Sequence, residues 1–432
     1  MKKTFKGIDL VNLSITNKCI LQCPSCPTGR QNFISQKALK YTPLDTCVKI
    51  FRKVLDIYGK QMFYLHIWNE PLIHPQLHEI LAALNNFGHT AFASSNLNLK
   101  QDWEKLLNAT ALKVLVVSMS GYHQETYERG HRGGNVELVL NNLKEIGKYT
   151  RDSRTQVVLN FHQYKDNAED AAILESLCNE YGIIFKPYLA SLLQDHIHED
   201  VVSGSPRWKQ NSDAMELVLP RLKFQPFPFT NIDNVAPVPC HSQNHVLVLD
   251  YEGNICTCTH KGPEDPNRLG NFLAMTKEDI DKAKKVAPVC VECRKLGLHL
   301  EYAFACFFER PSKDSSETIA LLKGSALSAD FANKKIFVFG AGMSGGAVAP
   351  FLKHRGYLVQ GFIDDDARKI GTLIHGLPVY AFSEVLANYP EAIIIDTIRS
   401  SPARKYVEDN PKNTGVSVYS AEDFLYTIVK NA

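Results

Sequence analysis

The chain has 432 residues, more than one ordinary domain holds, so two or three domains are expected. Hydrophobic residues make up 44% and charged residues 22%, a balance that is typical of globular proteins and argues against disorder. The formal net charge is only +2, and no apolar run reaches the roughly 18–20 residues that span a bilayer. We therefore expect a cytoplasmic protein without a signal peptide, with no nucleic-acid partner and no membrane segment.

The first half of the chain alternates apolar strands with amphipathic helices. The predicted strands are residues 12–17, 62–68, 90–95, 113–118, 156–162 and 183–188. The predicted helices between them are residues 43–58, 77–87, 136–149 and 168–181. Strand–helix repeats in series predict an α/β fold with a parallel sheet, either open or curved into a barrel.

The second half changes character several times. A connection rich in proline and charge, with one helix near 213–223, leads to a β-hairpin whose arms are 245–250 and 254–259. A polar linker follows, and then a second α/β pattern. Its predicted strands are residues 335–339, 357–363, 392–395 and 416–419, with a helix that ends at residue 355.

The chain has 11 cysteines, many for a cytoplasmic protein, in which disulfides are rare. Because they are clustered, metal ligation explains them better than packing does. Cys19, Cys23 and Cys26 follow the first predicted strand in a Cys-x3-Cys-x2-Cys spacing. Three thiolates on one loop can bind three irons of a cubane and leave the fourth iron open. A zinc site, which usually takes four ligands, and unligated thiols are the alternatives.

Residues 17–27 (NKCILQCPSCP) resemble the signature loop of the radical S-adenosylmethionine (SAM) superfamily. Later segments at the ends of predicted strands extend the resemblance over residues 8–190. These segments are Trp68-Asn69-Glu70-Pro71, Ser94-Ser95-Asn96, Ser118-Met119-Ser120-Gly121, Thr126-Tyr127-Glu128-Arg129 and Arg132-Gly133-Gly134-Asn135. The resemblance implies a partial (β/α)6 barrel in which Cys19, Cys23 and Cys26 hold an oxygen-sensitive [4Fe-4S] cluster that binds SAM.

The same resemblance implies which residues contact SAM. They are Asn69, Glu70 and Pro71 for the amino group, Ser95 and Asn96 for the ribose, and Ser118 and Arg132 for the carboxylate. Two residues depart from the family pattern. Asn69 replaces the usual glycine, which affects how closely the backbone approaches SAM, and Ser25 replaces a bulky residue that often contacts adenine.

A second set of cysteines consists of Cys240, Cys258, Cys290 and Cys293. Their spacing resembles the twitch domain of the SPASM/twitch branch, which implies one auxiliary [4Fe-4S] cluster. A zinc ribbon is the alternative, since four cysteines also suit zinc. Cys256 lies two residues before Cys258 and is a substitute ligand. The remaining cysteines, expected to be packing residues, are Cys47, Cys178 and Cys306.

Gly340, Gly342 and Gly345 lie between a predicted strand and a helix, where glycines let a phosphate approach the helix N-terminus. Asp364 ends the next strand, where an acidic side chain can hold a ribose hydroxyl. The segment from Phe339 onward resembles the Rossmann-like domains of sugar-modifying acetyltransferases, which implies a nucleotide or nucleotide-sugar ligand. A docking module that binds nothing is the alternative.

These features predict a radical SAM core and connection (8–235), a twitch domain (236–310), a linker (311–332) and a Rossmann-like domain (333–432). The cysteine spacing is most similar to that of the twitch-containing dehydrogenases of aminocyclitol biosynthesis. That similarity implies oxidation, or epimerisation, of a sugar-like substrate, with an electron donor such as flavodoxin or ferredoxin. Candidate acid–base residues near strand ends are His162, Tyr164, Lys186 and Tyr188.

Two other functions stay open. Many SPASM/twitch proteins modify peptides or mature another enzyme, and they often carry an N-terminal peptide-binding domain. Only 18 residues precede Cys19, so we expect a small-molecule substrate in preference to a peptide. A zinc-stabilised binding protein without enzymatic activity is the other alternative.

Overall fold

The computed structural model describes residues 3–29, 38–66, 68–190, 217, 219–221, 235–259, 268–300, 331, 333–398 and 416–421. Of the helix predicted near 213–223, the described part is the 3-10 helix η4 (Leu219–Arg221). The linker predicted at 311–332 lies almost wholly outside the described residues, and Cys306 lies outside them too. The chain has two compact units. One comprises Ile8–Pro226 and Gln243–Val289, and the other comprises Met1–Gly7, Phe227–Ser242 and Cys290–Ala432.

The first of these units contains a sheet of seven strands that are all parallel. They are β1 (Leu10–Leu13), β2 (Met62–Tyr64), β3 (Thr90–Ser95), β4 (Leu112–Met119), β5 (Gln156–Gln163), β6 (Ile184–Leu189) and β7 (Val246–Leu249). Their order is β6-β5-β4-β3-β2-β1-β7, so the first six strands lie in chain order. Among the described residues the ladder ends at β6 and β7, which makes the barrel partial, as predicted.

The edge strand β7 has a neighbour beyond the predicted hairpin. Residues 245–250 contact 254–259 as predicted, through the antiparallel Leu249↔Ile255 bridge and the Cys256 N–H, which donates to the Val248 oxygen at 2.9 Å. Val246–Leu249 also pair in parallel with β1, a contact that was not predicted. All four residues of β7 are buried, so the apolar strand completes the sheet at its open edge. The other arm forms only isolated bridges, Leu249↔Ile255 and Asn254↔Asn271. The turn itself is present, since the Asp250 carboxylate accepts the N–H groups of Glu252 and Asn254.

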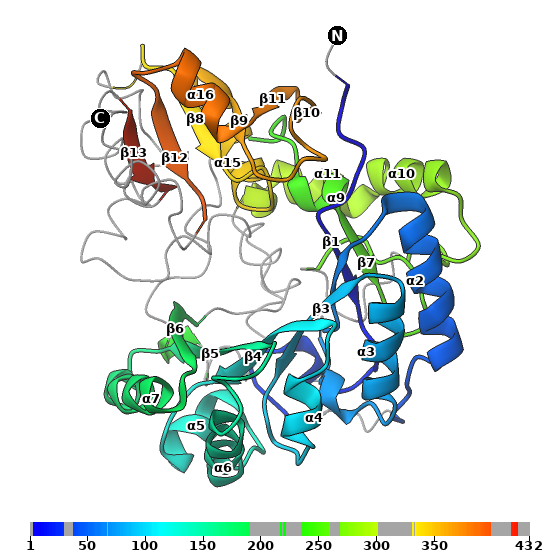
Figure 1. Cartoon of the computed structure of the whole chain (residues 1–432), viewed down its shortest axis with the longest axis vertical. Helices are drawn as coiled ribbons and strands as arrows, with labels where there is room; N and C mark the ends of the chain where they lie inside the picture. The colour runs from blue at the N-terminus through cyan, green and yellow to red at the C-terminus, as the bar shows by residue number, and fades with distance from the viewer. Residues whose placement is uncertain are drawn as a thin grey trace. The chain divides into compact units, whose positions relative to one another are not determined.

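The helices that follow the strands pack on one face of this sheet (Figure 1). They are α2 (Leu44–Tyr58), α3 (Leu77–Asn86), α4 (Trp103–Leu107), α5 (Gln124–Gly130), α6 (Val136–Gly147) and α7 (Ala168–Tyr181). In α2, buried residues recur at positions 47, 50, 51 and 54, the spacing of one helical face. These side chains join the strand residues in one apolar core, which contains Cys47 and Cys178, both fully buried.

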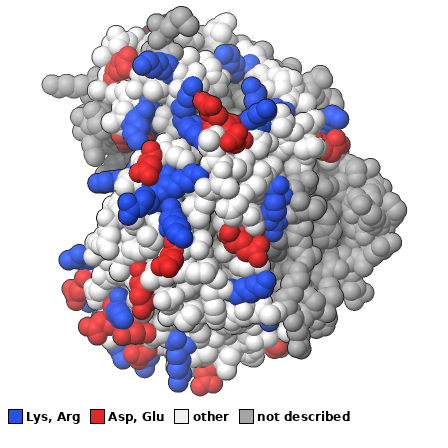
Figure 2. All heavy atoms as spheres, turned by 90° about the vertical axis from the view of Figure 1, so that its right-hand side faces the viewer, with Lys and Arg blue, Asp and Glu red and all other residues white. Residues whose placement is uncertain are grey.

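Further along the chain lie α9 (His241–His245), α10 (Lys277–Lys285) and α11 (Pro288–Lys295). A reciprocal capping box between Thr276 and Asp279 starts α10. Figure 2 shows lysine and arginine side chains interspersed with aspartate and glutamate over one face of the molecule. This mixed distribution agrees with the small net charge of the chain.

The other unit contains a sheet of six strands in the order β10-β11-β9-β8-β12-β13, parallel except for the β10–β11 pair. They are β8 (Ile336–Phe339), β9 (Val359–Ile363), β10 (Leu373–Ile374), β11 (Leu377–Tyr380), β12 (Ile393–Asp396) and β13 (Ser417–Ser420). Helix α15 (Gly345–His354) connects β8 to β9 and packs on both, while α16 (Phe382–Asn388) joins a core with Phe337 and Phe339. This is the predicted Rossmann-like arrangement.

Two of its features were not predicted. Strands β10 and β11 form a hairpin around His375 and Gly376, whose φ values are 52° and 75°. Two positive φ values in succession are typical of a type I′ hairpin turn. The arms have only two and four residues, too few for a hydrophobic period to be read from the sequence. Helix α16, with seven residues, is likewise too short for a helical hydrophobic period to be recognised in the sequence.

Candidate active site

The loop after β1 carries Cys19, Cys23 and Cys26, and the structure brings their thiols together. Burial raises the pKa of Cys23 well above its ordinary value, and the negative charges of Cys26 and Cys19 raise it further. Burial likewise raises the pKa of Cys26. The N–H groups of Gly29 and Thr28 favour its thiolate and lower the pKa, but by less than burial raises it. Three neighbouring thiols that repel one another when ionised fit a cationic iron cluster, which keeps its thiolate ligands deprotonated.

The glycine that follows the loop allows the cysteines to lie close to the chain. A Cβ added to Gly29 would lie 2.5 Å from the Cys23 nitrogen and 2.6 Å from its oxygen, both backbone atoms. Any larger residue would push this turn away from Cys23. The Cys26 N–H donates to the Cys23 oxygen at 3.2 Å and closes the turn between these two cysteines.

Glu70 lies beside this loop and is 1% exposed. Its carboxylate accepts the Asn96 N–H at 2.9 Å and the Leu72 N–H at 3.1 Å. Burial raises the pKa of Glu70 to about 7, although the hydrogen bonds from Asn96, Leu72 and the Ser95 side chain act in the opposite direction. A buried carboxylate of this kind suits a cationic partner such as an ammonium group, which would restore its negative charge.

Asn96 connects Glu70 with the cysteine loop, because its side-chain amide lies 3.4 Å from the Cys19 sulfur. Ser95 is buried and also accepts the Leu97 N–H. Asn69 donates to the Thr16 hydroxyl at 3.0 Å, and Pro71 begins a short buried 3-10 helix, η1 (Pro71–Ile73). Residues predicted at the ends of β1, β2 and β3 thus meet at one edge of the sheet.

The two residues predicted for the SAM carboxylate lie in different surroundings. Ser118 is on β4, and its hydroxyl is 3.3 Å from that of Ser94 on β3. Arg132 is hydrogen-bonded to the cysteine loop at Gln22. The Arg132 Nε donates to the Gln22 oxygen at 3.0 Å, and the Arg132 carbonyl oxygen accepts the Gln22 N–H at 2.9 Å. Its positive charge also lowers the pKa of Cys23, although burial outweighs this effect.

The four candidate acid–base residues divide into pairs. His162 and Tyr188 are register partners on β5 and β6 and share a hydrogen bond between the imidazole Nε2 and the phenol oxygen. Lys186 is half-buried two residues before Tyr188. Tyr164 is fully buried under the Arg221 guanidinium, 4.1 Å from its ring centre, and burial raises its pKa to about 12. Its position favours a packing role for Tyr164.

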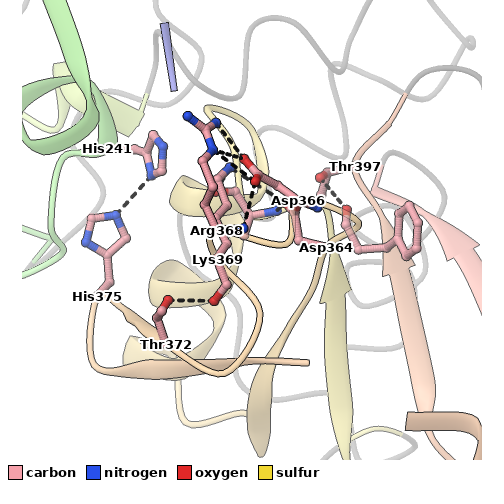
Figure 3. A network of polar contacts seen from close by, with 10 residues as sticks. His241, Asp364, Asp366, Arg368, Lys369, Thr372, His375 and Thr397 are labelled. Atoms are coloured by element: carbon pink, nitrogen blue, oxygen red, sulfur yellow. Dashed lines mark hydrogen bonds and ion pairs between the residues drawn. The ribbon is translucent and has the colours of Figure 1, made fainter. Parts of the chain in front are cut away.

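The glycine loop of the other unit is held by its own polar contacts (Figure 3). Asp364 accepts the Ala341 N–H at 2.7 Å, and Lys369 donates to the Ala341 oxygen at 3.1 Å. The third glycine is required, because a Cβ on Gly345 would lie 1.7 Å from the Gly340 oxygen. A Cβ on Gly342 would meet no atom within 4 Å, so this corner of the loop has room for a ligand.

Comparison with known families decides what the first site belongs to. A model of the Radical SAM superfamily matches residues 13–174, a range that includes the three cysteines, Glu70, Asn96, Ser118 and Arg132. The chain contains a radical SAM domain. A model described as a CoA binding domain matches residues 331–415, which include the glycine loop. No curated protein matches the sequence.

The solved structures that match this chain share little sequence with it. Streptococcus suis SuiB bound to its precursor peptide SuiA is 14% identical, with a TM-score of 0.47 and coverage of 67% of either chain. The anSMEcpe complex with AdoMet and the Cp18Cys peptide is 14% identical, with a TM-score of 0.42, over 66% of this chain and 84% of that one. BtrN in complex with AdoMet and 2-DOIA is 13% identical, with a TM-score of 0.40, over 72% and 95%.

Outside the radical SAM domain, the cysteines predicted for an auxiliary cluster are all half-buried. Cys258, with its neighbour Cys256, belongs to the same compact unit as that domain, whereas Cys240, Cys290 and Cys293 belong to the other. The predicted auxiliary cluster, the zinc alternative and the predicted domain limits stay predictions. None of the helices in the described ranges is long and apolar enough to cross a membrane.

Sequence reasoning named Tyr127 only as part of the segment Thr126–Arg129 and missed the buried His131 beside it. The Tyr127 ring stacks on His131 at 4.9 Å, and the Tyr127 hydroxyl accepts a hydrogen bond from Asn98 at 2.6 Å. His131 Nδ1 is 2.7 Å from the Ser120 hydroxyl, and burial lowers its pKa to about 4. The run Ser118–Gly121 pointed to this region, but a histidine 11 residues after Ser120 carries no signal of its own.

Proposed function

We propose that this protein is a radical SAM oxidoreductase that dehydrogenates a sugar-like substrate. Epimerisation of such a substrate is the less favoured reaction. The observation that carries the proposal is the meeting of three thiols with the buried Glu70 carboxylate at one edge of a radical SAM domain. Burial and the Glu70 charge both raise the pKa of Cys19, so sulfur ligands and a carboxylate occupy one small volume. A metal cluster and a cationic amino acid would neutralise this arrangement together.

In this proposal Cys19, Cys23 and Cys26 would hold a [4Fe-4S] cluster that leaves one iron open for SAM. When bound, the cluster and SAM would supply the radical chemistry that removes a hydrogen atom from the substrate. Glu70 holds the SAM ammonium group, and its two backbone hydrogen bonds fix the carboxylate in place. Arg132 steadies the cysteine loop through Gln22 while its charge favours a carboxylate nearby.

The oxidative outcome rests on the second cysteine set. We propose that Cys240, Cys258, Cys290 and Cys293 hold one auxiliary [4Fe-4S] cluster that accepts an electron from the substrate. All four cysteines are half-buried, which supports a ligand role. Cys47 and Cys178, which we assign to packing, are by contrast fully buried. An external donor such as flavodoxin or ferredoxin would supply the electron that starts each cycle.

For the C-terminal unit we propose a ligand with a nucleotide diphosphate group. CoA and nucleotide-sugars share this group, and a glycine loop before a helix N-terminus suits its phosphates. The room around Gly342 supports this assignment. Asp364 already accepts two backbone N–H groups, yet a carboxylate has further lone pairs with which to accept a ribose hydroxyl.

The proposal is tested by anaerobic reconstitution with iron and sulfide, followed by reduction with dithionite. We expect about eight irons per chain, as two cubanes require, and release of 5′-deoxyadenosine from SAM. Cys23→Ser should lose SAM cleavage by at least about 100-fold. Cys293→Ser should keep cleavage but bind about half of the iron. Cys178→Ala, which removes a buried thiol outside both sets, is the matched control.

The outcomes separate the alternatives. A colourless protein that holds only zinc and does not cleave SAM would sink the enzymatic proposal and favour a zinc-stabilised binding protein. Deoxyadenosine formed with a sugar substrate but without any ketone would count against oxidation. Modification of a peptide, with no reaction of sugars, would identify a peptide maturase instead.

A further inference from the structure

The radical SAM sheet has a second face, which points away from the helices. Side chains alternate along a strand, so if Val11, Phe63, Leu115 and Leu159 belong to the core, their neighbours point the other way. On this second face lie Tyr64, Phe92, Ser94, Ser118, Asn160 and Lys186. His66 follows β2 and lies against the Tyr64 and Phe92 rings of the same face. The face therefore combines aromatic rings with polar groups, most of them uncharged.

Two atoms on this face have no hydrogen-bond partner among the described residues. They are the Nδ1 atom of His66 and the Oδ1 atom of Asn160, and both are buried. A buried polar atom without a partner costs about 1–3 kcal/mol, and such atoms are rare in native proteins. Because neither atom is hydrogen-bonded within the described fold, a ligand group is the partner that both call for.

His66 is surrounded by aromatic rings. The centre of its ring is 5.5 Å from that of Phe92 and 6.0 Å from that of Tyr64, and those two rings stack on each other at 4.3 Å. Burial lowers the pKa of His66 to about 4, so the imidazole is neutral at pH 7. The surroundings therefore offer apolar ring faces and one uncharged nitrogen, which is a donor or an acceptor depending on the tautomer.

Asn160 belongs to a polar row across three strands. It is the register partner of Ser118 on β4 and of Lys186 on β6. The Ser118 hydroxyl is 3.3 Å from that of Ser94, so hydroxyl groups continue the row onto β3. Three strand spacings of about 4.8 Å separate the strands of His66 and Asn160, so a ligand that meets both atoms must present a different group to each.

We propose that His66 and Asn160 are specificity-determining residues that bind hydroxyl groups of a neutral, polyhydroxylated ring substrate. This inference rests on the proposed function and narrows its substrate class. A hydroxyl group both donates and accepts, so it can satisfy the His66 nitrogen in either tautomer as well as the Asn160 carbonyl oxygen. The C–H face of such a ring can pack on Tyr64 and Phe92. At the His66 end, where the neighbours are neutral rings, a charged group would stay unpaired, which burial makes costly.

The test uses His66→Phe and Asn160→Leu in the full, reconstituted chain, with Asn141→Leu on the exposed side of α6 as the control. The probes are myo-inositol, glucose, galactose and N-acetylglucosamine, with the peptide Gly-Cys-Ser-Ala as the competing class. Binding is followed by saturation-transfer NMR in the presence of SAM. We expect at least one polyol to bind. His66→Phe and Asn160→Leu should each lower the affinity for that polyol by about 10-fold or more, while Asn141→Leu should leave the affinity unchanged.

Stability gives a second readout that does not depend on activity. Since each variant removes an unpaired atom, its urea midpoint should equal or exceed that of the unchanged protein. Strong destabilisation of both variants, polyol binding that neither variant alters, binding of the peptide alone, or no polyol binding at all would each overturn the inference. Cleavage of SAM is measured on the same preparations. If the unchanged protein does not cleave SAM, the proposed function is refuted. The polyol result tests only the roles of His66 and Asn160.

Discussion

At the scale of single residues, burial decides the charge state of most titratable groups in the radical SAM domain. It raises the pKa of the cysteine thiols and of Glu70, and it lowers the pKa of His66, His131 and His162. The thiols and Glu70 gain compensation from the cofactors proposed for them. The histidines have none, so they stay neutral and make the fold sensitive to acid.

His131 gives this sensitivity a measurable form. The unfolded chain binds a proton near pH 6.5, whereas the folded ring binds one only near pH 4, so stability is lost as the pH falls through this window. For one such group the free energy of unfolding should drop by about 1 kcal/mol between pH 7 and pH 5.5. His131→Asn should flatten the pH dependence by this amount in urea titrations of the cluster-free protein.

The control for that measurement is His354→Asn. His354 is exposed at the end of α15, so this variant controls for the loss of a histidine that is not part of the buried core. Equal slopes for His131→Asn and the unchanged protein would show that His131 is protonated equally in the folded and unfolded states.

At the scale of elements, the end of β3 is held in place by α6. Leu97, directly after Asn96, is fully buried and has a φ of 53°, a region that favours glycine. The Asn142 side chain on α6 donates to the Leu97 and Leu99 oxygens at 2.8 Å each and accepts the Trp103 indole N–H at 3.2 Å. A single buried amide thus stabilises an unfavourable backbone conformation next to a predicted SAM contact.

Asn142→Leu should therefore affect both stability and SAM binding. It would leave two carbonyl oxygens and one indole N–H buried without partners, a loss of about 3 kcal/mol or more in the free energy of unfolding. Release of Leu97 should also displace Asn96 and lower the affinity for SAM by about 10-fold, as measured by equilibrium dialysis. Asn141→Leu, one residue earlier and exposed, is matched in chemistry and should change neither quantity. Unchanged SAM affinity in a destabilised Asn142→Leu protein would contradict the link between the two elements.

At the scale of the whole molecule, two sheets with separate cores carry two separate candidate sites. The thiols and Glu70 belong to the radical SAM sheet, and the glycine loop belongs to the six-stranded sheet. Ligand binding at the second site can therefore be tested while SAM cleavage is followed at the first. Thermal unfolding of the full chain with CoA or UDP-glucose should show ligand stabilisation, which reaches about 2.7 kcal/mol at 100 times the Kd.

Gly342→Leu should remove this stabilisation without harm to the fold. A Cβ at position 342 meets no atom within 4 Å, so the added side chain would occupy the space proposed for the ligand. Cleavage of SAM should be the same as in the unchanged protein. Equal stabilisation of both proteins would place the ligand elsewhere, and no stabilisation of either would favour the docking module that binds nothing.

Much of the fold follows from local patterns, because strand and helix periods are properties of neighbouring residues. Thr90–Ser95 and Ala168–Tyr181 have the predicted limits, and the glycine loop lies between β8 and α15 as expected. The first strand ends earlier than predicted, at Leu13, because Thr16 leaves the sheet to form a bridge with Tyr41. Such a departure depends on a partner 25 residues away.

The sequence by itself determined the radical SAM domain, since the spacing of Cys19, Cys23 and Cys26 is local and specific. Only the tertiary structure decided which groups surround them. It placed the Asn96 N–H on Glu70 and paired β7 with β1 as well as with its hairpin arm. It also left the His66 Nδ1 and Asn160 Oδ1 atoms without a hydrogen-bond partner among the described residues. The physical reason is that hydrogen bonding, burial and charge depend on residues far apart in the chain, which a local pattern does not record.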